Sequence, residues 1–285
     1  MKTKLFIISL FLILLTASTS ASIKLSKDAT ISILTCSPGN ELYSLFGHTG
    51  IRVVDKANDM DIVFNYGTFD FATQGFYFKF ARGLLPYQLS CSEFRRFLSS
   101  YIYDERSVYS QTLNLDSIQK QYLMDLLFEN YQPANREYLY NFLYDNCSTR
   151  VRDIIEKSTN NQITWIAQPS TKSFWNLLDE YLSRFPWIQW GIHTILGSPA
   201  TSVATIREQM FLPDYLMYHL DSAAYNGVPL VQPIETVYEA PEQDLSTPWY
   251  FSPFFVFAIC TLALILLLQK AKSRRLLKAI AIPFF

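Results

Sequence analysis

One cysteine in this sequence has the surroundings of a reactive thiol. Cys147 opens a stretch whose apolar residues share one face, namely Val151, Ile154 and Ile155. This spacing predicts a helix over residues 147–157 that starts at the cysteine. Unpaired N–H groups and the positive end of the helix dipole lower the pKa of a thiol at that position. Cys147 is therefore the candidate nucleophile, and a buried structural cysteine is the alternative.

A nucleophilic thiol needs a base and a polar group that orients this base. The sequence has three histidines: His48 opens a predicted strand, whereas His193 and His219 lie in a region broken by prolines. A predicted hairpin turn at residues 56–58 places Asn65 nearly opposite His48 on the next strand. We take His48 as the base and Asn65 as the third residue. The alternatives are a histidine with no catalytic role and an ordinary asparagine at a strand end.

The other cysteines and the histidines suggest no metal. Cys36 and Cys91 are candidates for a disulfide if the compartment is oxidising, and two unpaired core thiols are the alternative. Three scattered histidines and the lack of a Cys-x-x-Cys motif give no metal-ligand spacing, and no cofactor is predicted.

Both ends of the chain carry membrane-directed patterns. Residues 1–21 have two lysines, an apolar run and small residues, which predicts a signal peptide. The uncharged run in residues 250–269, followed by basic residues, predicts a transmembrane helix. Residues 22–245 are then a periplasmic catalytic domain at the bacterial inner membrane. Residues 270–285 are either a cytoplasmic end or a stub cut before a further membrane helix.

Composition narrows the class of protein. The chain is 49% hydrophobic, 16% aromatic and 17% charged, so it is not a disordered chain. Seven of the 24 Lys+Arg and none of the 25 Asp+Glu lie outside residues 22–245, which leaves this region a net charge of −8. The whole chain has a formal net charge of −1, which offers no basic surface for nucleic acid as a partner.

The predicted elements give the fold class. Residues 31–34, 48–54 and 61–66 alternate as strands do, and residues 116–130, 135–143 and 147–157 are predicted helices. Helical pieces broken by prolines follow from residue 165. Strands followed by surrounding helices predict an α+β domain with a small antiparallel sheet.

Five segments carry a resemblance to known proteins. The order His, Asn, Cys with Asn-Cys at a helix start resembles the circularly permuted papain-like (NlpC-like) fold of lecithin:retinol acyltransferase and its relatives. More closely, the region resembles the periplasmic domain of the Lnb-type lipoprotein N-acyltransferases. The matching segments are LTCSPGNELY (residues 34–43), FGHT (46–49), FNYGTF (64–69), YDNCSTR (144–150) and FLPDYL (211–216).

The resemblance implies an acyltransferase with lipid substrates. A fatty acyl chain would pass from a phospholipid, through a Cys147 thioester, to the α-amine of diacylglyceryl-Cys in a lipoprotein. Glu41, Asn146 and Tyr66 are then further candidates near the substrate, although an exposed loop carboxylate is the favoured interpretation of Glu41. The aromatic residues 185–190 are a candidate membrane anchor, with core packing as the alternative.

Three other functions stay open at this point. A cell-wall amidase or peptidase of the same fold would hand the acyl group to water, and a thiol lipase would release free fatty acid. A non-catalytic, membrane-tethered interaction domain is the third alternative, in which Cys147 and His48 are merely packed.

Overall fold

The computed structural model describes residues 23–70, 72–75, 79, 84–166, 170–241 and 248–270. The signal peptide predicted over residues 1–21 lies outside this part of the chain. Residues 271–285, which belong to the predicted cytoplasmic stub, also lie outside it.

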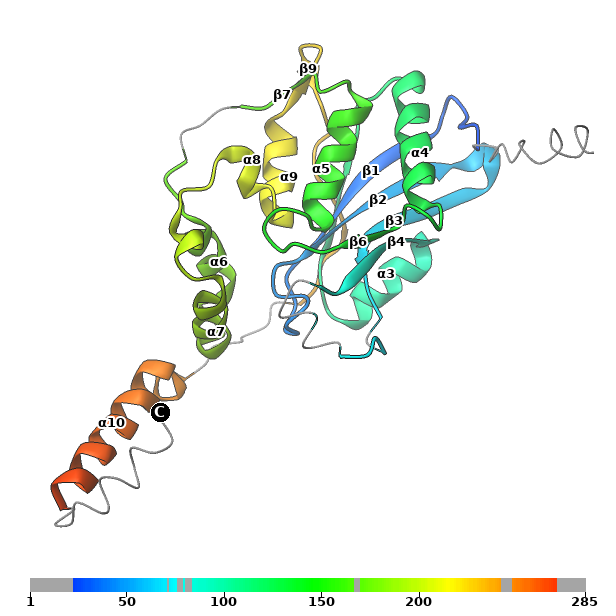
Figure 1. Cartoon of the computed structure of the whole chain (residues 1–285). Helices are drawn as coiled ribbons and strands as arrows, with labels where there is room; N and C mark the ends of the chain where they lie inside the picture. The colour runs from blue at the N-terminus through cyan, green and yellow to red at the C-terminus, as the bar shows by residue number, and fades with distance from the viewer. Residues whose placement is uncertain are drawn as a thin grey trace, which may run out of the picture.

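An antiparallel sheet forms the centre of the domain (Figure 1). In the described residues it has seven strands in the order β10-β5-β1-β2-β3-β4-β6. A second sheet of three short strands has the order β7-β8-β9. The strand bounds are β1 (Thr30–Cys36), β2 (His48–Asp55), β3 (Met60–Thr68), β4 (Pro86–Glu93), β5 (Val108–Thr112), β6 (Glu137–Leu139), β7 (Ile163–Thr164), β8 (Ala224–Tyr225), β9 (Val228–Pro229) and β10 (Glu235–Tyr238).

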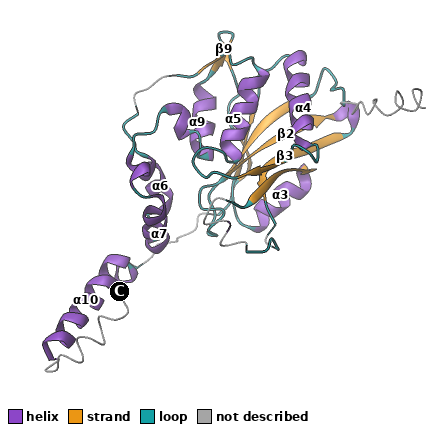
Figure 2. Ribbon diagram, in the orientation of Figure 1, coloured by secondary structure: helices purple, strands orange, loops and turns teal. Residues whose placement is uncertain are grey.

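Helices cover both faces of the main sheet and extend away from it (Figure 2). Their bounds are α3 (Phe94–Tyr103), α4 (Ser117–Tyr131), α5 (Cys147–Ser158), α6 (Phe174–Leu182), α7 (Pro186–Leu196), α8 (Ile206–Gln209), α9 (Pro213–Ser222) and α10 (Pro253–Lys270). The α+β class and the antiparallel sheet agree with the sequence prediction, but the sheet is larger than predicted.

The alternation of side chains along the strands builds a core on each face of the sheet. On β1, Ile31 and Ile33 belong to the core shared with α4 and α5, whereas Leu34 and Cys36 belong to the core shared with α3. Helix α5 packs directly on β2 and β3 and beside α4. The sheet thus provides a rigid support for the N-terminus of α5.

The hairpin of β2 and β3 forms where the sequence predicts it. Its turn is a 3-10 helix over Lys56–Asn58, and the Asp55 carboxylate accepts a hydrogen bond from the Ala57 N–H at 3.1 Å. The register pairs Asp55 with Met60 and runs to Ile51 with Phe64.

The prediction of a helix over residues 135–143 is wrong. Glu137–Leu139 is instead the edge strand β6, which pairs with Pro86–Gln88 of β4. Its aromatic side chains pack across this pair, with Tyr87 and Tyr140 stacked at 4.2 Å between ring centroids. The strand pairing therefore outweighs the local helical pattern.

A separate helical core lies beside the sheet. Helix α6 contributes Phe174, Leu177 and Leu178, which pack with Leu45 and with Phe211, just before α9. The apolar side of α7 adds to this core.

The prediction of a transmembrane helix over residues 250–269 is wrong. Helix α10 covers Pro253–Lys270, where the described part of the chain stops, and Gln269 and Lys270 are polar. Within the described ranges, no helix combines the length and the apolar character needed to span a membrane.

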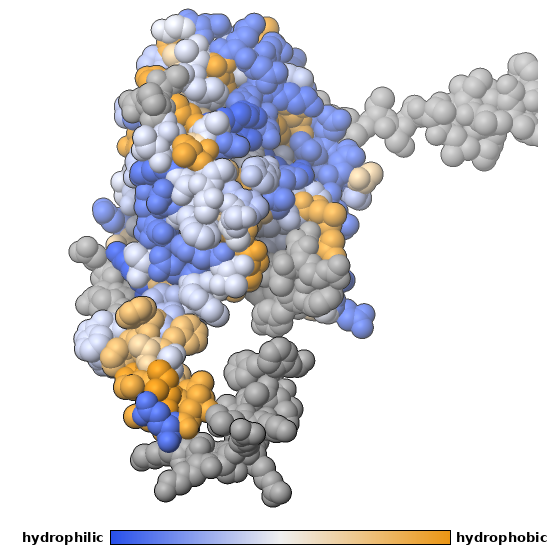
Figure 3. All heavy atoms as spheres, turned by 60° about the vertical axis from the view of Figure 1, so that its left-hand side comes forward, coloured by the Kyte–Doolittle hydropathy of each residue, from blue (hydrophilic) through white to orange (hydrophobic). Residues whose placement is uncertain are grey.

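The predicted aromatic anchor over residues 185–190 lies partly in a core and partly against α10. Phe185 and Ile188 pack on the helical core. The indole N–H of Trp187 donates to the carbonyl of Phe251 at 2.6 Å, and the Trp190 ring lies 5.5 Å from that of Phe257. Figure 3 shows apolar side chains gathered over α10, while the rest of that face is mostly polar.

Candidate active site

Cys147 is the first residue of α5, as the sequence predicts. Asn146 caps the helix: its side-chain oxygen accepts the Thr149 N–H at 3.0 Å, and the Thr149 hydroxyl oxygen accepts the Asn146 N–H at 2.8 Å. The amide group of Asn146 also donates to the carbonyls of Phe142 and Phe211, both at 2.8 Å. The start of α5 is therefore fixed to two other segments, and the thiol it carries is held in one place.

The structure brings His48 and Asn65 together on neighbouring strands. Asn65 Oδ1 lies 2.5 Å from His48 Nε2. The register extended from Ile51 and Phe64 would pair Asn65 with Gly50, two residues from the predicted position. Residues two apart on a strand share a face, so the side chains still meet diagonally. With Nε2 facing Asn65, the ring has Nδ1 left for another partner.

That partner is the Cys147 thiol, which is 8% exposed. Burial opposes its ionisation, but the charge of His48, a hydrogen bond from His48, and the backbone N–H groups of Thr49 and Ser148 outweigh this effect. Together they hold the pKa of Cys147 below its ordinary value. These contacts favour the thiolate form of Cys147, which is the form that a cysteine nucleophile needs.

The residues that follow His48 and Cys147 tie the two segments together. The hydroxyl groups of Thr49 and Ser148 are hydrogen-bonded at 2.9 Å, and both residues are fully buried. This bond links the start of β2 to the start of α5 across 99 positions in the sequence. This hydrogen bond fixes the distance between His48 and the Cys147 thiol. The types of these residues did not predict that Thr49 and Ser148 would be bonded to each other.

Gly67 leaves room for the pair at the end of β3. Its φ is +90°, a conformation that favours glycine, and it lies in a bulge between Asn65 and Thr68. A Cβ at this position would be 3.7 Å from Cys147 Cβ and 3.8 Å from His48 Cε1. The glycine therefore lets the strand bend beside the site, and the Asn-Tyr-Gly motif was the only sequence signal for it.

Tyrosines surround the thiol. Burial, with a further contribution from the Cys147 charge, raises the pKa of Tyr87, Tyr138 and Tyr140. These hydroxyl groups therefore stay neutral beside the thiol. Tyr66, a predicted substrate neighbour, is only 2% exposed and packs against Tyr138 at 6.4 Å between centroids, so it serves the core.

A salt bridge flanks the start of α5. Arg150 donates to both carboxylate oxygens of Asp145, at 2.6 and 2.8 Å, and its guanidinium lies 3.6 Å from the ring centre of Tyr138. This bidentate pair holds the loop before the helix against the tyrosines.

Two other predicted residues make contacts within the protein. Glu41 is exposed in a turn, where its main-chain carbonyl accepts the Ser44 N–H at 2.7 Å. Asn146 is a buried helix cap, and its side-chain bonds are satisfied within the protein as described above.

The disulfide predicted between Cys36 and Cys91 does not form, and both residues are free thiols. Cys36 ends β1 and Cys91 lies in β4, with β2 and β3 between them. Three strand spacings of about 4.8 Å keep the two apart, whereas disulfide-bonded Cα atoms lie within about 7 Å. Burial raises the pKa of Cys36 to about 12, so this thiol is inert.

The remaining histidines lie elsewhere. His193 Nε2 is 2.9 Å from a carboxylate oxygen of Asp179 in the helical core region, and burial lowers the pKa of His219 on α9. Across the described segments, no group of three or more His, Cys, Asp or Glu residues is arranged to hold a metal ion.

The fold and the site define an α+β domain in which a helix-capping Asn-Cys meets a His–Asn pair from a β-hairpin. The chain matches the family model described as the Lnb N-terminal periplasmic domain over residues 18–180, more than half of its length. It therefore belongs to this family, which confirms the resemblance in the sequence and places the domain in the periplasm in a lipoprotein-related role. No curated protein and no solved structure matches the chain.

Proposed function

We propose that this protein is a thiol acyltransferase that acts at the periplasmic face of the inner membrane. Its acyl donor is a phospholipid, and its acceptor is the α-amine of diacylglyceryl-Cys at the N-terminus of a lipoprotein. The observation that carries the proposal is the meeting of a buried thiol at the start of α5 with the hydrogen-bonded pair of His48 and Asn65, in a chain of the Lnb family.

The first half of the reaction loads the enzyme. The Cys147 thiolate attacks the ester carbonyl carbon of the phospholipid, and a tetrahedral oxyanion forms. The backbone N–H of Cys147, in the first turn of α5, is a donor for that oxyanion. The carbon–oxygen bond to glycerol then breaks, His48 gives its proton to the leaving alkoxide, and a thioester remains on Cys147.

The second half transfers the acyl chain. The neutral α-amine of the lipoprotein attacks the thioester carbonyl while His48 accepts a proton from the nitrogen. The carbon–sulfur bond breaks, and the electron pair returns to Cys147 as the thiolate. Asn65 holds the imidazole in the orientation and tautomer that both steps need.

The test follows the acyl chain by mass spectrometry. The full chain is incubated with phospholipid vesicles and a diacylated lipopeptide, and both the enzyme and the peptide are weighed. We expect one added acyl chain on the peptide and an acyl adduct on Cys147. The Cys147→Ala variant should lose both. Cys91→Ala is the matched control, because this free cysteine lies on β4, away from His48, and should leave both signals intact.

Other outcomes point to other functions. Free fatty acid with an unchanged peptide would mean a thiol lipase. No acyl adduct with a folded protein would refute the proposal and favour a cell-wall hydrolase or an interaction domain.

A further inference from the structure

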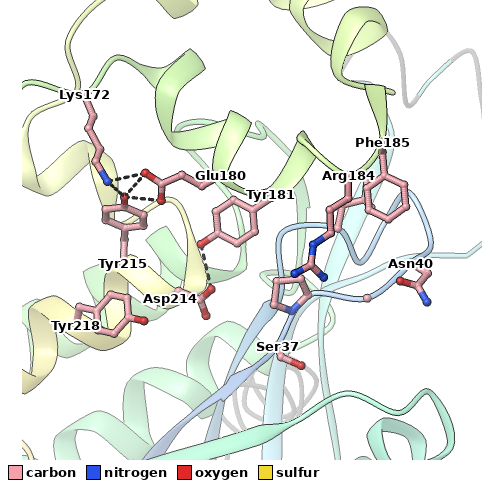
Figure 4. A pocket seen from close by; sticks show the side chains of 13 residues that line it. Ser37, Asn40, Lys172, Glu180, Tyr181, Arg184, Phe185, Asp214, Tyr215 and Tyr218 are labelled. Atoms are coloured by element: carbon pink, nitrogen blue, oxygen red, sulfur yellow. Dashed lines mark hydrogen bonds and ion pairs between the residues drawn. The ribbon is translucent and has the colours of Figure 1, made fainter. Parts of the chain in front are cut away.

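A charged cleft lies beside the candidate active site and takes no part in the chemistry above. It has a volume of about 710 Å³ and lies between α6, α9 and the loop that joins β1 to β2. Neither Cys147 nor His48 lines it. Figure 4 shows its polar side chains converging from the two helices and the loop.

The cleft contains opposite charges in separate positions. Lys172 donates to Glu180 at 2.5 Å and to the Tyr215 hydroxyl at 2.8 Å, which forms a closed cluster on one side. Arg184 lines the cleft on the other side of Tyr181, and Asp214 lies below the Tyr181 hydroxyl. The four formal charges sum to zero, so a simple anion or cation would meet as much repulsion as attraction.

Asp214 has capacity left for a ligand. Its Oδ2 accepts the Tyr181 hydroxyl at 3.0 Å, and burial raises the pKa of its carboxyl group. A partly buried carboxylate with one hydrogen bond gains most from a further N–H donor. An ammonium group is such a donor, and the ring of Tyr218 lines the same cleft.

One layer of side chains separates the cleft from His48. Leu45 lines it, and the next ring, that of Phe46, packs on the cleft residue Tyr181 at 5.8 Å between centroids. A Cβ placed on Gly47, which precedes His48, would be 3.5 Å from Pro213, the neighbour of Asp214. A ligand part held in the cleft would therefore lie next to the reacting centre but outside it.

A glycerophospholipid has this arrangement, because glycerol separates its headgroup from its acyl ester by a few bonds. We propose that the charged cleft binds the headgroup of the donor lipid and that it selects a zwitterionic phosphoethanolamine group. The phosphate faces Arg184, and the ammonium faces Asp214. This inference rests on the proposed function, since it assigns the headgroup site of that donor.

The charges also explain why other headgroups fit less well. An anionic phosphoglycerol has no ammonium to offset the carboxylates of Asp214 and Glu180. A phosphocholine keeps the charge but has no N–H to donate to them.

The binding test avoids turnover. The full-length Cys147→Ala variant is titrated with soluble glycerophosphoethanolamine by isothermal calorimetry, with glycerophosphoglycerol and inorganic phosphate as comparison ligands. We expect glycerophosphoethanolamine to bind most tightly. Asp214→Asn should weaken it about tenfold and abolish its advantage over glycerophosphoglycerol. Asp221→Asn, on the exposed side of the same helix, is the matched control and should change nothing.

A second variant guards against misfolding. Arg184 is exposed, so Arg184→Gln should fold, and it should weaken all three phosphorylated ligands. Equal affinities for the ligands, or an Asp214→Asn variant that folds and binds glycerophosphoethanolamine normally, would overturn the assignment.

Vesicles identify the source of the headgroup. Wild-type protein should form its acyl adduct faster on phosphatidylethanolamine than on phosphatidylglycerol vesicles, and Asp214→Asn should lose this preference. If the soluble ligand binds but the vesicles show no preference, the cleft is a site for a free phospho-amine and the lipid assignment fails. If the soluble ligand binds and no lipid gives an adduct, the acyltransferase proposal fails instead.

Discussion

Replacing Asn146 by alanine should cost about 3 kcal/mol of unfolding free energy, because this side chain does more than cap α5. Loss of an N-cap costs about 1 kcal/mol. The same change removes the donors that the buried amide gives to the carbonyls of Phe142 and Phe211. Each buried bond of this kind contributes about 1 kcal/mol.

The assay is urea unfolding followed by circular dichroism, with Ser173→Ala as the matched control. Ser173 caps α6 in the same reciprocal arrangement with Asn176, but its bonds are exposed. Its removal should cost about 1 kcal/mol. Asn146→Asp separates the two contributions, since it keeps the acceptor for the Thr149 N–H and loses both donors. We expect it to be at least as unstable as Asn146→Ala, because a carboxylate would face two carbonyls.

Equal losses for Asn146→Ala and Ser173→Ala would refute this reasoning. That result would mean that Asn146 acts as a cap alone and that its amide bonds do not hold α5 in place. A fully stable Asn146→Asp variant would lead to the same conclusion.

Three further predictions concern the site itself. Iodoacetamide, followed by peptide mapping, should modify Cys147 at about pH 7, where ordinary thiols are largely protonated, whereas Cys36, with its pKa raised to about 12, should stay unmodified. The modification rate at Cys147 should fall only as the pH drops through its depressed pKa, and His48→Ala should move this pH profile to higher pH. Asn65→Ala should slow acyl transfer about 10- to 100-fold, and Asn65→Asp should keep most of the wild-type rate. An unchanged rate in Asn65→Ala would show that Asn65 has no part in the mechanism. Gly67→Ala should lose roughly 1–2 kcal/mol in urea unfolding because its φ is +90°, and a loss near zero would show that the bulge can relax.

Patterns among residues close together in the sequence were enough to predict the helix and the hairpin that carry the site. The spacing of Val151, Ile154 and Ile155 was enough to predict the helix that starts at Cys147, and the cap bonds that begin this helix join residues only three apart. The turn at Lys56–Asn58 likewise sets the β2–β3 hairpin from neighbouring residues. The five short segments were together specific enough to indicate the family, which the match over residues 18–180 confirms.

The order of the strands could not be predicted from the sequence. For this reason the sequence left open whether Cys36 and Cys91 pair, and it gave a wrong helix over residues 135–143. The disulfide between Cys36 and Cys91 required β1 and β4 to be neighbours, but a residue pattern does not say which strands intervene. Residues 135–143 had a helical pattern, yet an open edge of β4 made a strand more favourable there. The membrane helix was predicted from an uncharged apolar run alone, whereas no helix in the described residues combines the length and the apolar character needed to span a membrane.

The sequence by itself determined the residue types, the capped helix that carries Cys147 and the hairpin that carries His48 and Asn65. Only the tertiary structure decided that these meet, through the Thr49–Ser148 bond, and that residues from α6 and α9 form a charged cleft beside them. The physical reason is the range of the interactions. Caps and turns join residues a few positions apart, whereas the pKa of the thiol depends on groups that the chain separates by about a hundred positions, and the cleft combines residues 37–45 with residues 172–218.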